Sequence, residues 1–107
     1  MPIALRRRLF WRSPRRAFDA SGRFRASRCV VAALQADRAV LLDPDVGAYF
    51  GLDAVGSRIW ALLDEPRSAA ELAELLEAEY DAPPVRLRAD TEALLAALLN
   101  ANLVEAV

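Results

Sequence analysis

Residues 41–53, LLDPDVGAYFGLD, constrain the fold most, because two short apolar segments enclose a compact turn there. In such a turn proline presets φ, aspartate bonds its own backbone, and a final glycine accepts a positive φ. The segment at 48–52 then has the pattern of a strand that stops at Asp53, where a helix begins. Little strand-forming sequence follows it. We therefore expect this strand to have an open edge, and an open edge either needs protection or has a use.

Two earlier strands are predicted before this turn. Residues 29–34, CVVAAL, form a β-branched apolar run, and residues 39–42, AVLL, follow after a connection at 35–38 that lacks a glycine. Consecutive strands joined by short connections pair as antiparallel neighbours. The first half of the domain is therefore predicted to be a three-stranded antiparallel meander.

Two helices are predicted directly after the meander. Asp53 is placed to cap a helix that ends at Leu63, because apolar residues recur there at helical spacing. Ser68 and Glu71 have the spacing of a capping box and indicate the start of a second helix. The pattern of this second helix continues to about Tyr80.

A third helix is expected from about residue 87 to 99, after the break at 81–84, and Asn100 in the left-handed conformation would close it. Residues 102–107 are a candidate for a short final strand. The predicted class is α+β: a winged helix-turn-helix-like domain in which a three-stranded antiparallel sheet is followed by three helices. That outline serves both DNA reading and peptide capture, so it assigns no function by itself. The inner stripe of the third helix is predicted to be Leu87, Thr91, Leu94, Leu95 and Leu98.

The charge is distributed unevenly along the 107 residues, whose formal net charge is only −1. Residues 1–28 hold nine arginines and one acid, whereas residues 29–107 hold five arginines and fourteen acids. We interpret 1–28 as an Arg-rich N-terminal extension and 29–107 as one folded domain. The extension is either disordered or, with Phe10 and Trp11 between its arginines, a contact for an acidic partner, nucleic acid or an anionic membrane surface.

The residue types exclude most catalytic chemistry. The chain has no histidine and no lysine, which removes the commonest general base, the commonest metal ligand and Schiff-base chemistry. No glycine-rich phosphate loop is present. The acidic pairs Asp64–Glu65 and Glu77 with Glu79 are interpreted as solvated surface charge. The sequence therefore predicts a protein that is not an enzyme and holds no cofactor or metal.

The single cysteine, Cys29, cannot form an internal disulfide, and we interpret it as a buried structural thiol beside two valines. No apolar run approaches the ~20 residues that a membrane crossing needs. The N-terminus lacks the apolar core of a signal peptide. A cytoplasmic location is therefore expected. The oligomeric state is left open.

The ordered series of segments resembles the PqqD-like family, over about residues 29–105. The resemblance rests on RAVLLDPDVGAYFGLDAVGSRIWALLDEPRSAAELAELLEAEYD followed by ADTEALLAALLNANLVE. It includes a strand with an aromatic pair before a glycine, a Leu-Asp helix start, a small residue before Ile-Trp, and a Ser-capped second helix. One departure is Asn100-Ala101-Asn102, which stands where the family usually has a glycine.

This resemblance implies a peptide chaperone of ribosomal peptide biosynthesis, with lasso-peptide systems as the first expectation. The leader of a precursor peptide would add as a strand beside residues 48–52, in a cleft next to the third helix. The implied partners are that leader, a leader-cleaving cysteine protease and an ATP-dependent cyclase. The predicted peptide-binding residues are Ala48, Tyr49, Phe50, Gly51 and Leu52 on the strand, and Arg86, Asp90, Ala93, Leu94 and Ala97 on the helix.

On the strand, we expect the side chains of Phe50 and Leu52 to point inward and that of Tyr49 to form a rim, while Gly51 admits a close backbone. Arg86 or Asp90 would pair with charge on the leader, and the small Ala93 and Ala97 would leave room for its side chains. Plain helix surface remains the alternative for each of these helix residues.

The alternative function is a winged-helix nucleic-acid-binding protein that uses the basic N-terminal arm. A groove-reading helix should present Arg, Lys, Asn or Gln. The second helix instead carries four glutamates in AAELAELLEAEY. Only the arm is then suited to phosphate, and such binding would lack sequence preference.

Overall fold

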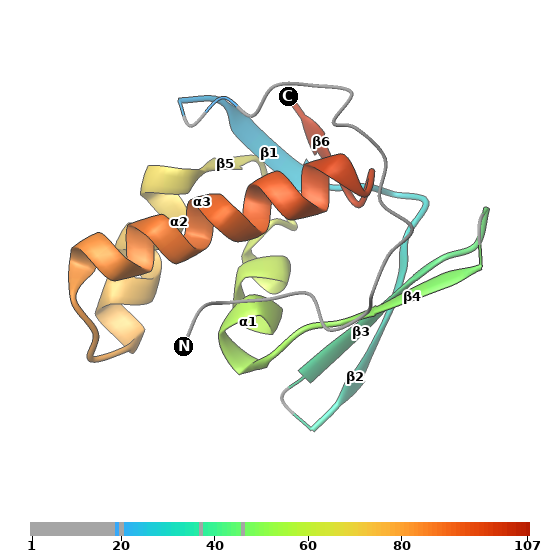
Figure 1. Cartoon of the computed structure of the whole chain (residues 1–107), viewed down its shortest axis with the longest axis horizontal. Helices are drawn as coiled ribbons and strands as arrows, with labels where there is room; N and C mark the ends of the chain where they lie inside the picture. The colour runs from blue at the N-terminus through green and yellow to red at the C-terminus, as the bar shows by residue number, and fades with distance from the viewer. Residues whose placement is uncertain (1–18, 20, 37, 46) are drawn as a thin grey trace.

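The computed structural model describes residues 19, 21–36, 38–45 and 47–107. Three helices and two small sheets surround one core (Figure 1). In chain order the elements are β1 (Arg23–Ala26), β2 (Val31–Gln35), β3 (Arg38–Asp43), β4 (Ala48–Gly51), α1 (Ala54–Leu62), β5 (Arg67–Ser68), α2 (Ala69–Glu79), α3 (Pro84–Asn100) and β6 (Val104–Ala106).

The predicted meander is confirmed. β2, β3 and β4 form an antiparallel sheet in that order, with β3 in the centre. Val31 pairs with Leu42, and Leu42 pairs with Tyr49 on the other side. The turn between β3 and β4 has the predicted chemistry, because Gly47 has φ +67° and the Asp43 carboxylate accepts the Asp45 N–H at 3.0 Å.

A second antiparallel sheet, in the order β5-β1-β6, was not predicted as such. Its β6 confirms the short final strand. Its β1 lies before the predicted domain boundary at residue 28, and Phe24 of β1 is buried in the core. That boundary was therefore placed too late, since the folded domain includes residues 23–26. Residues 1–18 and 20 of the Arg-rich extension lie outside the described residues.

The predicted helix starts are confirmed for α1 and α2. The Asp53 side chain accepts the Gly56 N–H at 2.8 Å. Ser68 and Glu71 form the complete capping box, with the Ser68 N–H donating to Glu71 at 2.8 Å and the Glu71 N–H donating to Ser68 Oγ at 3.2 Å. Both helices therefore begin where a side chain satisfies their free backbone donors.

The third helix differs from its prediction at both ends. It begins at Pro84 rather than near residue 87, because a proline in the first turn needs no N–H partner and has a helical φ already. At its other end Asn100 is still helical, and the left-handed residue is Asn102, with φ 60°. The predicted inner stripe is confirmed by burial of Leu87, Thr91, Leu94, Leu95 and Leu98.

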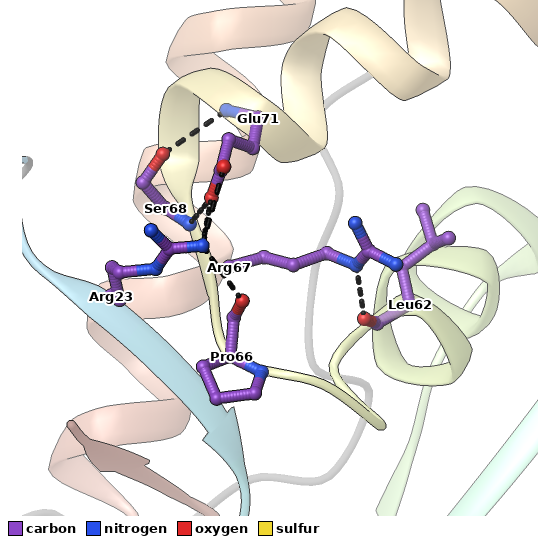
Figure 2. A network of polar contacts seen from close by, with 6 residues as sticks. All are labelled: Arg23, Leu62, Pro66, Arg67, Ser68 and Glu71. Atoms are coloured by element: carbon purple, nitrogen blue, oxygen red, sulfur yellow. Dashed lines mark hydrogen bonds and ion pairs between the residues drawn. The ribbon is translucent and has the colours of Figure 1, made fainter.

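Two arginines join the start of α2 to its neighbours (Figure 2). Arg23 of β1 lies 3.2 Å from the Glu71 carboxylate and donates to the Pro66 carbonyl at 3.3 Å. Arg67 donates to the Leu62 carbonyl at 2.7 Å, at the end of α1. The Ser68 N–H, followed by the Arg23 charge, lowers the pKa of Glu71. These contacts tie β1, α1 and α2 together. We call the three helices and the β5-β1-β6 sheet the helical half of the molecule.

The prediction of a buried Cys29 was wrong, because this free cysteine is exposed. It precedes β2, whose residues are all exposed. Among the helices of the described residues, none has the length and apolar character to span a membrane.

Candidate functional site

The side chains of β4 alternate between core and solvent. Phe50 and Leu52 are 2% and 1% exposed, and Ala48 is buried beside them. Tyr49, between Ala48 and Phe50, is 58% exposed. This confirms the predicted inward direction of Phe50 and Leu52, whereas a role of the exposed Tyr49 as the rim of a binding cleft stays a prediction.

The peptide groups of β4 also alternate, since those of one residue point toward β3 and those of the next point away. One hydrogen bond shows which residues do which. The Leu52 N–H donates to the Ala39 carbonyl at 2.9 Å, so these two residues form a hydrogen-bonded pair. In an antiparallel ladder such pairs alternate with pairs whose peptide groups point away. With the register of β3 and β4, Leu41 and Phe50 form the next hydrogen-bonded pair. The residues between, Tyr49 and Gly51, direct their N–H and C=O groups away from β3.

The direction of these peptide groups reduces the number of residues in the predicted site that can offer backbone hydrogen bonds to an added strand. All of residues 48–52 were expected to offer backbone groups, but Ala48, Phe50 and Leu52 direct theirs toward β3. Among the described residues no strand pairs with the outer side of β4, which is one edge of the sheet. In the part of the chain that the structure describes, the peptide groups that face outward at this edge are those of Tyr49 and Gly51.

The opposite edge of the same sheet is β2. Since the peptide groups of Leu41 point to β4, those of Val40 and Leu42 point to β2 and meet Ala33 and Val31. The groups of Ala32 and Leu34 therefore face outward. Leu34 is 73% exposed, and no residue of β2 is buried. The sheet thus has two edges, of which only β4 is anchored in the core.

The predicted residues on α3 are dispersed. Arg86 and Asp90 form an ion pair with each other at 3.7 Å. The first turn of α3 lies at the opposite side of the molecule from β4 (Figure 1). A contact of Arg86 or Asp90 with a peptide at that edge stays a prediction. Leu94 is buried in the core, whereas Ala93 is exposed and Ala97 half-buried. A contact of Ala93 or Ala97 with a bound peptide stays a prediction.

One polar side chain at the end of β4 was not singled out from the sequence. Ser57 of α1 accepts the Ala39 N–H at 2.6 Å and donates to the Leu52 carbonyl at 3.4 Å. In the sequence it is only a small residue before Ile59 and Trp60. Its role depends on the contact between α1 and β3, which spacing alone does not reveal.

The comparison with protein families matches the model described as coenzyme PQQ synthesis protein D (PqqD) to residues 38–104. This match spans β3 to the start of β6, so it contains β4, α1 and α3. None of the curated proteins matches significantly.

Three solved structures are similar to this chain. TbiB1 in complex with the TbiA(beta) leader peptide is 43% identical, with a TM-score of 0.70, over 76% of this chain and 94% of that one. Lasso peptide synthetase B1 complexed with the leader peptide is 27% identical, with a TM-score of 0.68, over 77% and 96%. The PqqD truncation of Methylobacterium extorquens PqqCD, described as a functional stand-alone recognition element for ribosomally synthesised and modified peptides, is 30% identical, with a TM-score of 0.69, over 83% and 95%.

Proposed function

Because the chain belongs to the PqqD family, we propose that it binds the leader of a ribosomally synthesised precursor peptide and catalyses no reaction itself. Two of the similar structures hold a leader peptide, and the one with TbiA(beta) is 43% identical to this chain. The observation that carries the proposal is the edge position of β4, with the outward peptide groups of Tyr49 and Gly51. The proposed pathway is that of a lasso peptide.

The proposed mechanism is addition of the leader as a further strand beside β4. An extended peptide with its own N–H and C=O groups opposite Tyr49 and Gly51 would continue the ladder by one strand. Backbone pairing demands little of the peptide sequence, so selectivity has to come from side chains at the edge. Tyr49 contributes an aromatic ring and a hydroxyl there, and Gly51 lets the second backbone approach closely.

The proposed partners beyond the leader are a leader-cleaving cysteine protease and an ATP-dependent cyclase. A protein that holds the leader through backbone bonds leaves the core peptide free, and can therefore present it to separate enzymes. The absence of histidine and lysine from the sequence supports this division of labour, because the domain lacks the commonest general base and the amine that Schiff-base chemistry needs. A cytoplasmic site of action is part of the proposal.

Nucleic-acid binding is the less favoured reading. The exposed side of α2 carries Glu74 and Glu77, which would repel phosphate. Glu71 and Glu79 on the same helix are already paired with Arg23 and Arg58. Binding through the N-terminal arm alone would be strongly salt-dependent and indifferent to sequence.

The decisive experiment is a fluorescence anisotropy titration with two labelled peptides. One is the TbiA(beta) leader, and the other is the leader peptide of the lasso peptide synthetase B1 complex. We expect dissociation constants in the micromolar to nanomolar range, ~8–12 kcal/mol, since strand pairing must offset the ordering of a flexible peptide. Scrambled leaders are the control. Equal affinity for native and scrambled leaders, or no binding of either leader, would overturn the proposal.

A further inference from the structure

Ser57 stands at the corner where β4 ends and α1 begins. Its side chain is 5% exposed, so its hydroxyl is shielded from water. The hydroxyl accepts the Ala39 N–H from β3 at 2.6 Å and donates to the Leu52 carbonyl at 3.4 Å. The serine N–H is used separately, as a normal helical donor to the Asp53 carbonyl at 2.8 Å. One hydroxyl therefore connects β3, the end of β4 and α1.

This hydroxyl takes the place of a ladder bond. Two residues in a hydrogen-bonded antiparallel pair normally exchange two N–H···O=C bonds. At Ala39 and Leu52 one of them is direct, from the Leu52 N–H to the Ala39 carbonyl at 2.9 Å. The return connection runs through the Ser57 hydroxyl, which accepts a hydrogen bond from the Ala39 N–H and donates one to the Leu52 carbonyl. The final rung of the β3–β4 ladder thus includes a side chain from the helix.

We propose that Ser57 is a positioning residue for the peptide-binding edge, an inference that rests on the proposed function. Leu52 follows Gly51 directly, so fixing the Leu52 peptide groups also fixes the direction of those at Gly51. Removal of the hydroxyl leaves the buried Ala39 N–H without its partner. The end of β4 then loosens, and a leader has to order this strand as it binds, which lowers the affinity.

If Ser57 only stabilised the fold, its loss would affect leader binding no more than the loss of another stabilising hydroxyl. Ser68 provides the matched control. Ser68 is also a serine whose hydroxyl bonds a backbone N–H, that of Glu71 at 3.2 Å. It caps α2 and belongs to the β5-β1-β6 sheet rather than to the meander. Both Ser57→Ala and Ser68→Ala should lower the melting temperature. Only Ser57→Ala should change leader binding by the folded protein.

The experiment titrates labelled TbiA(beta) leader into the full chain and both variants, at a temperature where melting curves show each to be folded. Ser57→Ala should weaken binding about tenfold, while Ser68→Ala should remain within about twofold of the parent. Ser57→Cys, whose thiol is a weak donor and acceptor, should lie between the parent and Ser57→Ala. Equal weakening by Ser57→Ala and Ser68→Ala would overturn the positioning role.

Amide hydrogen exchange of the free protein tests the same role without a leader. Ser57→Ala should speed exchange of the Ala39 and Leu52 amides more than that of α2 amides, and Ser68→Ala should do the reverse. Unselective acceleration by Ser57→Ala would overturn the inference. Failure of the parent protein to bind any leader would contradict the proposed function instead, so the two failures are distinguishable.

Discussion

β2 and β4 are the two edges of one sheet, yet they differ in how the rest of the molecule supports them. β4 inserts Ala48 and Phe50 into the core, and only Tyr49 turns its side chain to solvent. β2 has no buried residue, although Leu34 is paired with the buried Ala39. The core therefore extends under β3 and β4 and stops before β2.

The difference teaches that an exposed edge is not sufficient for tight strand addition. A peptide that pairs with an anchored strand meets backbone groups already held in place, so little further ordering is needed. A peptide at β2 would have to order a strand whose side chains contact little. Both edges offer outward peptide groups, but β4 is the better template. In order of expected effect, two predictions test this comparison of β2 with β4, and two test whether the helices are independent of the β4 edge.

Truncation of one large apolar side chain on each edge strand should have the largest effect. Phe50→Ala should lower the free energy of unfolding by about 3–5 kcal/mol, because it removes a fully buried ring. Leu34→Ala, at a position that is 73% exposed, should cost less than about 0.5 kcal/mol. Urea unfolding followed by circular dichroism measures both. Comparable losses would show that β2 is anchored as firmly as β4.

Proline substitution on each edge strand tests which of the two strands pairs with the leader. Tyr49→Pro and Leu34→Pro each remove an outward N–H, on β4 and on β2. If the leader pairs with β4, Tyr49→Pro should weaken binding at least about tenfold, since a hydrogen bond worth ~1.4 kcal/mol is lost and the ring obstructs the added strand. Leu34→Pro should leave the affinity unchanged. Calorimetric titration with the leader measures both, and the opposite ranking would place the peptide on β2.

The same contrast explains what could be predicted from the sequence. Alternation at 48–52 was enough to give the direction of Phe50 and Tyr49, and the capping residues Asp53 and Ser68 gave the helix starts. Cys29 was misjudged because an apolar run predicts burial only if other elements cover it, and within the described part of the chain no element covers β2. The strand β1 was missed because its partners, β5 and β6, lie far away in the sequence. Ser57 depends on the same kind of long-range contact.

A smaller effect is expected within the helical half. Thr91 of α3 is fully buried, and its Oγ1 has no hydrogen-bond partner among the described residues. Thr91→Val should stabilise the fold by about 1 kcal/mol, because it replaces an unpaired hydroxyl with a methyl group of similar volume. Thr91→Ser keeps the hydroxyl and should instead destabilise. Chemical unfolding measures both, and unchanged leader affinity in Thr91→Val would show that stability in the helical half is separable from the β4 edge.

The smallest effect concerns the acid side of the stability curve, where only the helical half should respond. Arg58 of α1 donates to both Glu79 oxygens at 2.9 and 3.1 Å, and this hydrogen bonding lowers the pKa of Glu79 below its ordinary value near 4.5. A carboxylate whose pKa is lower in the folded state stabilises the fold above its unfolded pKa, and that contribution is lost as the pH falls through the folded pKa. Glu79→Gln should therefore lower stability at neutral pH by less than about 1 kcal/mol, since the pair is exposed, and should flatten the decline below pH 4.5. Glu77→Gln, at an exposed position on the same helix, is the control. If stability depends on pH in the same way in the parent and in Glu79→Gln, this ion pair does not hold α1 to α2. A change in leader affinity of Glu79→Gln at neutral pH would mean that the helical half and the β4 edge are coupled.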